Sequence, residues 1–400
     1  MVNRSTPPLH GLTVLDFTRV LSGPYCTMLL GDMGARVIKI EHPERGDDTR
    51  GWGPPFQGSE SAYFLSVNRN KESVTLDLKN PAAGAILSRL LDRADVLVEN
   101  FRPGTMDRLG LGYEAVAERY PRLVYCSISG FGQNGPRSRQ AGYDAVIQAE
   151  GGLMSITGDA DGPPYRLGVA ISDIVSGMFA AQGIAMALLA RERSGRGQLV
   201  DIGMLDATTA LLTYQAAICF ATGAPPTRMG NRHPTIVPYE TFPVADGEIV
   251  VAVGNDEQWC RFCEVIGASQ LSSDARFATN RLRVENYREL RPRLTDLLSR
   301  RTRDQWLREF TKAGVPSGAV RDVGEVLKDP QLGVREMIAS VEHATLGLVR
   351  VLGVPIKLSQ NPGAVRTAPP TLGQHTDSIL RREVGLTDAD IQQLRDKHAI

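Results

Sequence analysis

Cysteine is scarce in this sequence: only five are scattered along 400 residues. An odd, sparse set argues against a disulfide framework and fits a reducing compartment. Cys260 and Cys263 have the Cys-x-x-Cys spacing, but a metal site would need a second pair of ligands, and a redox site would have to follow a strand. Both lie within residues 255–266, whose pattern is typical of an amphipathic helix. We therefore interpret them as two half-buried helix residues.

An excess of charge of either sign is also lacking. The 45 basic residues balance 45 acidic ones, and no basic stripe or charged tail occurs. Nucleic acids and membrane surfaces are therefore not expected partners. The N-terminal stretch MVNRSTPP lacks the apolar core of a signal peptide, and we find no apolar run of the length that spans a membrane. We expect a soluble, cytoplasmic protein.

Motifs for common cofactors and metals are missing as well. The loop after the first predicted strand, TRVLSGP over residues 18–24, contains neither Gly-x-Gly-x-x-Gly nor a P-loop. The serine-hydrolase Gly-x-Ser-x-Gly and the zinc-protease His-Glu-x-x-His are absent, and the six histidines do not pair at metal spacing. These absences argue against a nicotinamide or ATP enzyme, and we expect no metal and no tightly bound cofactor.

What is present in the first third of the chain is an alternation of short apolar runs with helical patterns. We predict helices over 23–34 and 81–94, and strands over 12–17, 37–41, 73–78, 95–99 and 123–129. This spacing is typical of right-handed βαβ units around a parallel sheet, so we expect an α/β, Rossmann-like domain.

The later part of the chain has a different texture. Helical patterns over 174–193 and 205–222 lead to the Gly/Pro-rich stretch TGAPPT at 222–227, where we place a domain boundary. Strands are predicted over 239–242 and 248–253, followed by arginine-rich helices over 281–301 and 303–313. A final helix should begin after Thr387 as its cap. We therefore predict a second, smaller α+β domain.

One acidic residue stands out by its position. Asp173 lies in GVAISDIVSGM, directly before the predicted long apolar helix. Two roles are open for it. Asp is a favoured helix cap, which alone would explain its presence. A carboxylate at a helix N-terminus is also favoured in its ionised form, which suits a nucleophile. The small residues Gly168, Ala170 and Gly177 would leave room for an acyl chain.

Longer motifs indicate a family. The chain resembles the class III coenzyme A transferases, which include formyl-CoA transferase and the carnitine CoA-transferases. The resemblance runs from about residue 9 to residue 380 and rests on LHGLTVLDFT, GARVIKIEHP, NRNKESVTLDLK, VENFRPGTMDRLG, GYDAVIQAEGG, SGRGQ and APPTLGQHT.

The resemblance implies a domain arrangement and an oligomer. A large Rossmann-like CoA-binding domain would comprise residues 1–200, followed by a linker at 201–225 and a small domain at 226–330. Residues 335–400 would return to the large domain. Two subunits of such proteins thread through each other as interlocked rings, so a homodimer is expected.

The resemblance also implies an activity and a site. Asp173 matches the family nucleophile, which forms an acyl-aspartyl anhydride and then an aspartyl-CoA thioester. CoA, as substrate, would lie along positions that match Leu21, Ser22, His42, Leu76, Lys79, Asn100, Phe101, Arg102, Arg108 and Tyr143. The chain departs from some members at His42, where they have an arginine, and at Ala141, where they have a lysine. It also lacks the glycine-rich loop of formyl-CoA transferase, for which residues 229–234 are the expected stand-in.

The acid side of the site is implied less directly. Backbone amides near Gly151 and Gly152 are expected to stabilise oxyanions. The stretch RMGNRHPTIVPY resembles the corresponding part of succinyl-CoA:glutarate transferases and would place Arg232 or His233 over the active site. Succinyl-CoA is then the expected donor and a dicarboxylate the expected acid. The alternative is that Arg232 and His233 are ordinary residues of a surface loop.

Two other functions are weighed against the transferase. An α-methylacyl-CoA racemase of the same fold would carry a histidine where this chain has Tyr143, so the base that shuttles the proton is missing. An inactive CoA-binding protein is the other alternative, and the intact motif around Asp173 argues against it.

Overall fold

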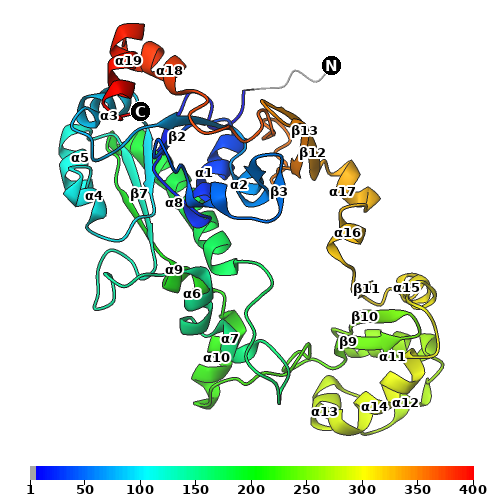
Figure 1. Cartoon of the computed structure of the whole chain (residues 1–400). Coiled ribbons are helices and arrows are strands. Elements are labelled where there is room, and N and C mark those ends of the chain that lie inside the picture. The colour runs from blue at the N-terminus through cyan, green and yellow to red at the C-terminus, as the bar shows by residue number, and fades with distance from the viewer. Residues whose placement is uncertain (1–5) are drawn as a thin grey trace. The chain divides into compact units, whose positions relative to one another are not determined.

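The computed structural model describes residues 6–400, so the expected start of the large domain at residue 1 lies outside the described range. The chain forms two compact units (Figure 1). The first unit comprises the chain up to Leu153 together with Arg166–Ala217 and Pro330–Ile400. The second comprises Met154–Tyr165 and Ile218–Asp329. The C-terminal segment thus belongs to the same unit as the N-terminal one.

The first unit is built on a six-stranded parallel sheet in the order β5-β2-β1-β6-β7-β8. The chain fills one half of the sheet from β1 outward and then returns to the other side of β1 with β6. This is the doubly wound arrangement, in which the order reverses between β1 and β6. The strands are β1 Thr13–Asp16, β2 Arg36–Glu41, β5 Lys71–Thr75, β6 Val96–Glu99, β7 Val124–Ser129 and β8 Leu199–Gly203.

Both faces of this sheet are buried, because successive side chains of a strand point to opposite faces. Val14 packs in one apolar core and its neighbour Leu15 in the other. The Val14 core contains residues of α1 (Ser22–Asp32) and α8 (Ile171–Ser194). The Leu15 core contains α3 (Ala83–Leu91) and residues of the C-terminal segment. The alternation in the sequence therefore produces a sheet covered by helices on both sides.

The remaining elements of the first unit are short helices and two hairpins. They are η1 Asp48–Gly51, β3 Phe56–Gln57, β4 Glu60–Ser61, α2 Ala62–Val67, α4 Thr105–Arg108, α5 Tyr113–Arg119, α6 Asp144–Glu150, α9 Met204–Ala210, α17 Pro330–Val334, β12 Ile338–His343, β13 Gly347–Leu352, α18 Thr376–Ile379, η2 Leu380–Val384 and α19 Asp388–Asp396. The predicted cap of α19 is confirmed, because Thr387 forms a capping box with Asp390. Two further helices, α7 Leu153–Ile156 and α10 Thr213–Thr222, cross the division between the units.

The second unit has its own sheet and core. Three antiparallel strands in the order β11-β10-β9 pack with helices around stacked aromatic rings, which include Trp259, Phe262 and Phe310. The predicted helix over 255–266 is α11, where Cys263 is buried and Cys260 is exposed. The elements are β9 Tyr239–Val244, β10 Gly247–Ala252, α11 Asp256–Val265, α12 Gln270–Ser273, α13 Asn280–Glu285, α14 Tyr287–Leu298, α15 Arg303–Lys312, β11 Ser317–Ala319 and α16 Val323–Val326.

The structure departs from the expected elements around residue 200. The expected end of the large domain at residue 200 falls inside β8, the sixth strand of its sheet. The sequence obscures this strand because it lies at the sheet edge and carries an exposed Asp201 in its middle. The single helix predicted over 205–222 is two helices, α9 and α10, bent by 75°. The expected linker therefore begins with elements of the first unit.

Helix α8 is long and apolar enough to cross a membrane by length and composition, and the bent pair α9–α10 passes the same test. From the sequence we expected no apolar run long enough to span a membrane, and this expectation is corrected. Core helices of soluble proteins share these properties, and α8 packs on the sheet through Ala180 and Ile184. A cytoplasmic location stays a prediction.

Candidate active site

The loops at the carboxyl ends of β1 and β6 meet at the point where the strand order reverses. The Arg19 amide donates to Asn100 Oδ1 at 2.9 Å, and Asn100 Nδ2 donates to the Arg19 carbonyl at 2.7 Å. Open α/β sheets bind ligands in the crevice at this position, because the chain continues from the two strands to opposite faces of the sheet. The topology alone therefore directs attention to residues 17–22 and 100–104.

The first of these loops is strained and firmly held. Val20 has φ +70°, a conformation that costs a β-branched residue of the order of 1–3 kcal/mol. Its amide donates to Asp47 Oδ1 at 3.2 Å, and Asp47 pairs with the fully buried Lys39 at 2.9 Å. Burial works against ionisation of Asp47, but the Lys39 ammonium and hydrogen bonds from Thr49 outweigh it and hold its pKa at about 2. A buried ion pair thus fixes the loop that leads to Ser22.

Asp173 lies in the first turn of α8 and faces this loop. The helix begins at Ile171 with Ala170 as its N-cap residue, so Asp173 is not the cap, and that alternative is wrong. Its carboxylate accepts hydrogen bonds from the Ser22 side chain and backbone at the start of α1. Helices α1 and α8 approach closely because Gly177 has no side chain: a Cβ there would lie 2.5 Å from the Ser22 carbonyl oxygen. Gly177 therefore brings Asp173 to Ser22.

The ionisation of Asp173 differs from the expectation. Burial, followed by the negative charge of Asp144, raises the pKa of Asp173 to about 7, although the hydrogen bonds from Ser22 lower it. The favourable effect of the helix N-terminus was expected to dominate, and the loss of water around the carboxylate outweighs it. A carboxyl group with a pKa near neutrality is ionised in a large fraction of molecules at physiological pH and remains more basic than an ordinary aspartate.

Two adjoining cavities connect Asp173 with the outer part of the loops. A cavity of about 310 Å³ around Asp173 shares Arg19, Asp48, Phe101 and Thr105 with a second cavity of about 590 Å³. All the expected CoA positions except Leu21 line one or both of them. Ser22, Asn100, Arg102 and Tyr143 line the first, His42, Leu76, Lys79 and Arg108 line the second, and Phe101 lines both. Leu21 is buried and packs with Met28 and Val67.

Several cations that line these cavities have no ion pair with any described residue. In the described chain, Lys79 and Arg102 make no ion pair, and Arg108 Nη2 donates only to the Thr105 hydroxyl at 3.1 Å. Arg19 is paired with Asp48 at 3.2 Å, but both side chains are about half exposed, and its guanidinium lies over the Phe101 ring at 5.2 Å. Such cations are available for an anionic ligand, with phosphates as suitable partners.

The glycines expected to supply oxyanion donors do not lie in this cavity. The Gly151 amide donates to the Ile147 carbonyl at 2.7 Å, and the Gly152 amide donates to the Ala149 carbonyl at 3.4 Å. Both amides thus complete the last turn of α6. Gly151 has a packing role, because a Cβ there would lie 2.7 Å from the Thr208 methyl group. Both amides are thus engaged within the chain, and an oxyanion role for amides near these glycines stays a prediction.

Arg232 and His233 belong to the second unit. The Arg232 guanidinium lies over the Tyr287 ring at 3.6 Å, and its buried Nε has no hydrogen-bond partner among the described residues. His233 stacks on Tyr239 with ring centroids 5.2 Å apart, and burial lowers its pKa. Arg228 donates to the Gly162 carbonyl at 2.8 Å and ties this loop to the other segment of the unit.

Several residues of the site were not singled out from the sequence. Arg19 and Asp48 line both cavities, and Asp144 is the charge next to Asp173. Arg19 has a usable signal, since it follows the first strand of a parallel sheet. The run GFGQNG at 130–135 matches Gly-x-Gly-x-x-Gly directly after β7, but the next helix begins only at Asp144, so no helix N-terminus faces that turn.

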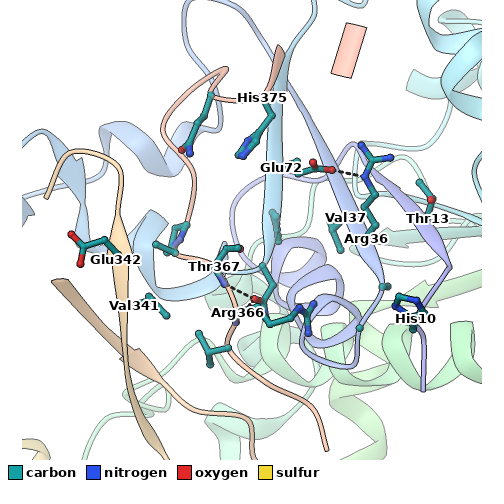
Figure 2. Close-up of a pocket in the computed structure, with 18 of the residues that line it drawn as sticks. His10, Thr13, Arg36, Val37, Glu72, Val341, Glu342, Arg366, Thr367 and His375 are labelled. Atoms are coloured by element: carbon teal, nitrogen blue, oxygen red, sulfur yellow. Dashed lines mark hydrogen bonds and ion pairs between the residues drawn. The ribbon is translucent and has the colours of Figure 1, made fainter. Parts of the chain in front are cut away.

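A larger cavity, of about 950 Å³, lies elsewhere in the described part of the chain (Figure 2). It is formed at the opposite edge of the sheet, where β1, β2 and β5 begin. Figure 2 shows Arg36 paired with Glu72, at 2.6 Å; Arg36 also contacts Glu383 at 2.8 Å. Arg366 donates to the carbonyls of Gly31 and Asp32. Because Arg36 is held in ion pairs and Arg366 by backbone carbonyls, these two cations are less available to an anionic ligand than Lys79 and Arg102.

Comparison with known proteins identifies the family of the chain. The model of CoA-transferase family III matches residues 9–376. Human succinyl-CoA:glutarate CoA-transferase is 42% identical over 387 residues, which cover 97% of this chain and 88% of the relative. Acetyl-CoA:oxalate CoA-transferase of Acetobacter aceti is 44% identical over 389 residues, which cover 96% of this chain and 97% of the relative.

Solved structures give the same result. A CaiB/BaiF family protein from Brucella suis superposes with a TM-score of 0.84 at 41% identity, covering 94% of this chain and 99% of that one. The Rv3272 protein of Mycobacterium tuberculosis has a TM-score of 0.82 at 32% identity, covering 93% and 99%. The chain therefore belongs to CoA-transferase family III, and the resemblance inferred from its motifs is confirmed. It is a class III CoA-transferase, with CoA as a substrate group.

Proposed function

We propose that this enzyme moves CoA between succinyl-CoA and a free dicarboxylate, with Asp173 as the covalent nucleophile. The observation that carries the proposal is the position of Asp173. It is a half-buried carboxylate at the inner end of two joined cavities whose outer end carries cations without ion pairs. Its pKa of about 7 suits a nucleophile that must be ionised yet basic.

The chemistry proceeds in two halves. An Asp173 oxygen attacks the thioester carbonyl, the carbon–sulfur bond breaks, and CoA leaves as a thiolate while an acyl-aspartyl anhydride forms. The thiolate then attacks the aspartyl carbonyl, the anhydride carbon–oxygen bond breaks, and the first acid leaves as a carboxylate. The second acid attacks the resulting aspartyl-CoA thioester and reverses both steps. The loss of water around Asp173 protects the anhydride from hydrolysis.

The two cavities suit the two ends of CoA. The phosphates would lie in the outer cavity among His42, Lys79 and Arg108, and the thioester would enter the inner cavity beside Tyr143. Arg19, at the junction, would face the middle of the molecule. Binding energy from the phosphates can hold CoA in place while the acyl group is exchanged, because these contacts are remote from the reacting bonds.

A dicarboxylate is supported by the relatives and by Arg232. Several relatives carry names of succinyl-CoA transferases that act on glutarate, D-citramalate or mesaconate. The carboxylate that does not react is costly to bury without a cation, and an arginine can meet it bidentately. The buried Arg232 Nε without a partner is suited to such a ligand.

The experiment is an exchange assay followed by mass spectrometry. Incubation of succinyl-CoA with glutarate should yield glutaryl-CoA and succinate, and butyrate should be a poor acceptor. Incubation with succinyl-CoA alone should place CoA on the peptide that contains Asp173. Epimerisation of a 2-methylacyl-CoA without exchange would instead indicate a racemase, and binding without either reaction an inactive protein.

We also propose that the enzyme is a homodimer whose second copy covers apolar helix faces exposed in the single chain. Met178, Met186 and Leu189 on α8 are 52%, 59% and 61% exposed, and none of the residues of α10 is buried. Several large apolar side chains exposed on one helix are typical of a surface that a partner subunit covers. Sedimentation should give a dimer that does not dissociate on dilution. A folded monomer would contradict the interlocked arrangement that the family resemblance implies.

A further inference from the structure

The start of α8 is held by another helix rather than by its own residues. Ala170 occupies the N-cap position and has no side chain that can accept a hydrogen bond. The missing acceptor comes from α6, where Asp144 Oδ1 accepts from the Ser172 amide at 2.9 Å. Ser172 is fully buried and directly precedes Asp173. Asp144 therefore caps the helix that carries the nucleophile.

Gln148 extends this contact by one turn of α6. Its side chain is fully buried, and its Nε2 donates to Asp144 Oδ2 at 2.7 Å and to the Val169 carbonyl at 3.4 Å. Its Oε1 accepts from the Leu167 amide at 2.8 Å. Residues four apart on a helix share a face, so Asp144 and Gln148 together hold the backbone of residues 167–172. Here these two side chains and their contacts are named the α6 clamp.

We propose that the α6 clamp positions Asp173 for attack and adjusts its charge, an inference that rests on Asp173 being the nucleophile. The clamp fixes the peptide immediately before Asp173, and Ser22 receives the carboxylate on the other side. Small displacements of a reacting group carry large penalties in rate, because attack requires a narrow range of distance and angle. Asp144 and Gln148 act through the backbone and are positioning residues, not catalytic ones.

The charge of Asp144 gives the clamp a second effect. The polar groups that face Asp173 are Ser22 from α1, Tyr63 from α2 and Asp144 from α6. The charged residues Arg19, Asp48 and Arg102 line the same cavity. Burial is the first cause of the raised pKa of Asp173, and the Asp144 charge is the second. Removing that charge should lower this pKa and move the acidic limb of the activity profile to lower pH.

In the clamp, the Gln148 amide donates and the Asp144 carboxylate accepts. Exchanging the amide and the carboxylate between positions 144 and 148 therefore tests the clamp. Asp144→Asn turns an NH₂ group toward the Gln148 NH₂ group, and Gln148→Glu turns a carboxylate toward Asp144. Each single variant therefore breaks the clamp. In the double variant D144N/Q148E, the new amide donates to the new carboxylate, and the contacts with the Ser172 and Leu167 amides are restored. Only the 3.4 Å contact with the Val169 carbonyl is lost.

The measurements are kcat, KM for acyl-CoA and the pH profile of kcat. We expect kcat of each single variant to fall about 10- to 100-fold with KM for acyl-CoA little changed. The double variant should recover to within about threefold of wild type, because the two effects are coupled. The acidic limb should move to lower pH in D144N and to higher pH in Q148E, and it should lie between these two in the double variant, which loses one negative charge and gains another.

Two further variants distinguish positioning of Asp173 from a general loss of stability. Thr387→Ala removes the cap of α19, so it should lower stability without changing kcat or its pH profile. If Q148E does not fold, Asp144→Glu should still lower kcat while leaving the acidic limb in place, because it keeps the charge and displaces the carboxylate. If wild type forms the Asp173 thioester and the single variants match wild type, the clamp is refuted. If wild type forms no such thioester, the proposed function fails instead.

Discussion

The two edges of the parallel sheet, where the strands begin and where they end, differ in how their cationic side chains are paired. At the edge where the strands begin, a cavity of about 950 Å³ is lined by Arg36, which pairs with Glu72 and Glu383, and by Arg366, which donates to carbonyls of the chain, while the buried Arg36 Nη2 has no hydrogen-bond partner among the described residues. At the edge where the strands end, smaller cavities of about 310 and 590 Å³ contain Lys79 and Arg102 without ion pairs in the described chain. Volume therefore does not locate the site, whereas unsatisfied charge at the topological switch point does.

The two edges also differ in the residue that takes a positive φ: at the opposite edge it is Asn70, which tolerates this conformation better than a β-branched residue. The carboxyl edge contains Val20 at positive φ and a carboxyl group, Asp173, whose pKa is about 7. A β-branched residue at positive φ and a raised carboxyl pKa both reduce stability, so their presence beside the candidate site indicates a function that compensates for the cost. At the opposite edge the ion pairs contribute to the fold. The following predictions test this division.

The largest effect is expected for Asp173→Ala. Exchange should fall by a factor on the order of 10⁴ or more, because the covalent intermediate cannot form. The affinity for CoA, measured by titration calorimetry, should stay close to that of wild type. Residual exchange well above the uncatalysed background would contradict the assignment of Asp173.

The next effect concerns the cations of the outer cavity. Lys79→Met and Arg108→Met should each weaken CoA binding by about 1–3 kcal/mol if they contact a phosphate. The loss should shrink as salt is raised, since the contact is electrostatic.

Arg36→Met is the matched control at the opposite edge. It removes the same charge, so CoA affinity should be unchanged while thermal stability falls, because Glu72 and Glu383 lose a partner. Weakened CoA binding in this variant, or unchanged binding in both Lys79→Met and Arg108→Met, would break the comparison between the edges.

A smaller effect is expected from Arg232→Ala in the second unit. Its KM for glutarate should rise about tenfold, while its use of a monocarboxylate such as butyrate should change little. The measurement is acid-dependent exchange in wild type and variant. Equal use of glutarate and butyrate by wild type would remove the dicarboxylate proposal, and a preference that survives Arg232→Ala would assign the role to another cation.

The smallest effect is a gain in stability from Asp173→Asn. The pKa of Asp173 is raised by folding from 3.8 to about 7, so its ionised form opposes folding. Wild type therefore loses stability as the pH rises through about 7, and the variant does not. At pH 8 we expect the variant to be more stable by about 1 kcal/mol, allowing for solvent screening. The gain should vanish below pH 4, and denaturant unfolding at both pH values checks it.

Much of the fold could be predicted from the sequence because it depends on local pattern. The alternation at Val14 and Leu15 specifies a strand buried on both faces, and Thr387 with Asp390 specifies a helix start. The edge strand β8 was missed because Asp201 interrupts its apolar pattern and no local feature shows that it pairs with β7. Edge pairing is a long-range property, which a window of residues does not contain.

For the site, the sequence by itself determined the family and led to the prediction that Asp173 is the nucleophile, because both are carried by contiguous motifs. The tertiary structure alone decided the environment of that carboxylate. Ser22, Asp144 and Gly177 come from three separate helices; burial and the charge of Asp144 raise a pKa that the helix N-terminus alone was expected to lower, and hydrogen bonding to Ser22 only partly opposes the rise. Whether Arg36 is paired with Glu383, 347 residues away, is likewise fixed only when the chain ends meet. Electrostatics depends on distances through space, and those are set by packing.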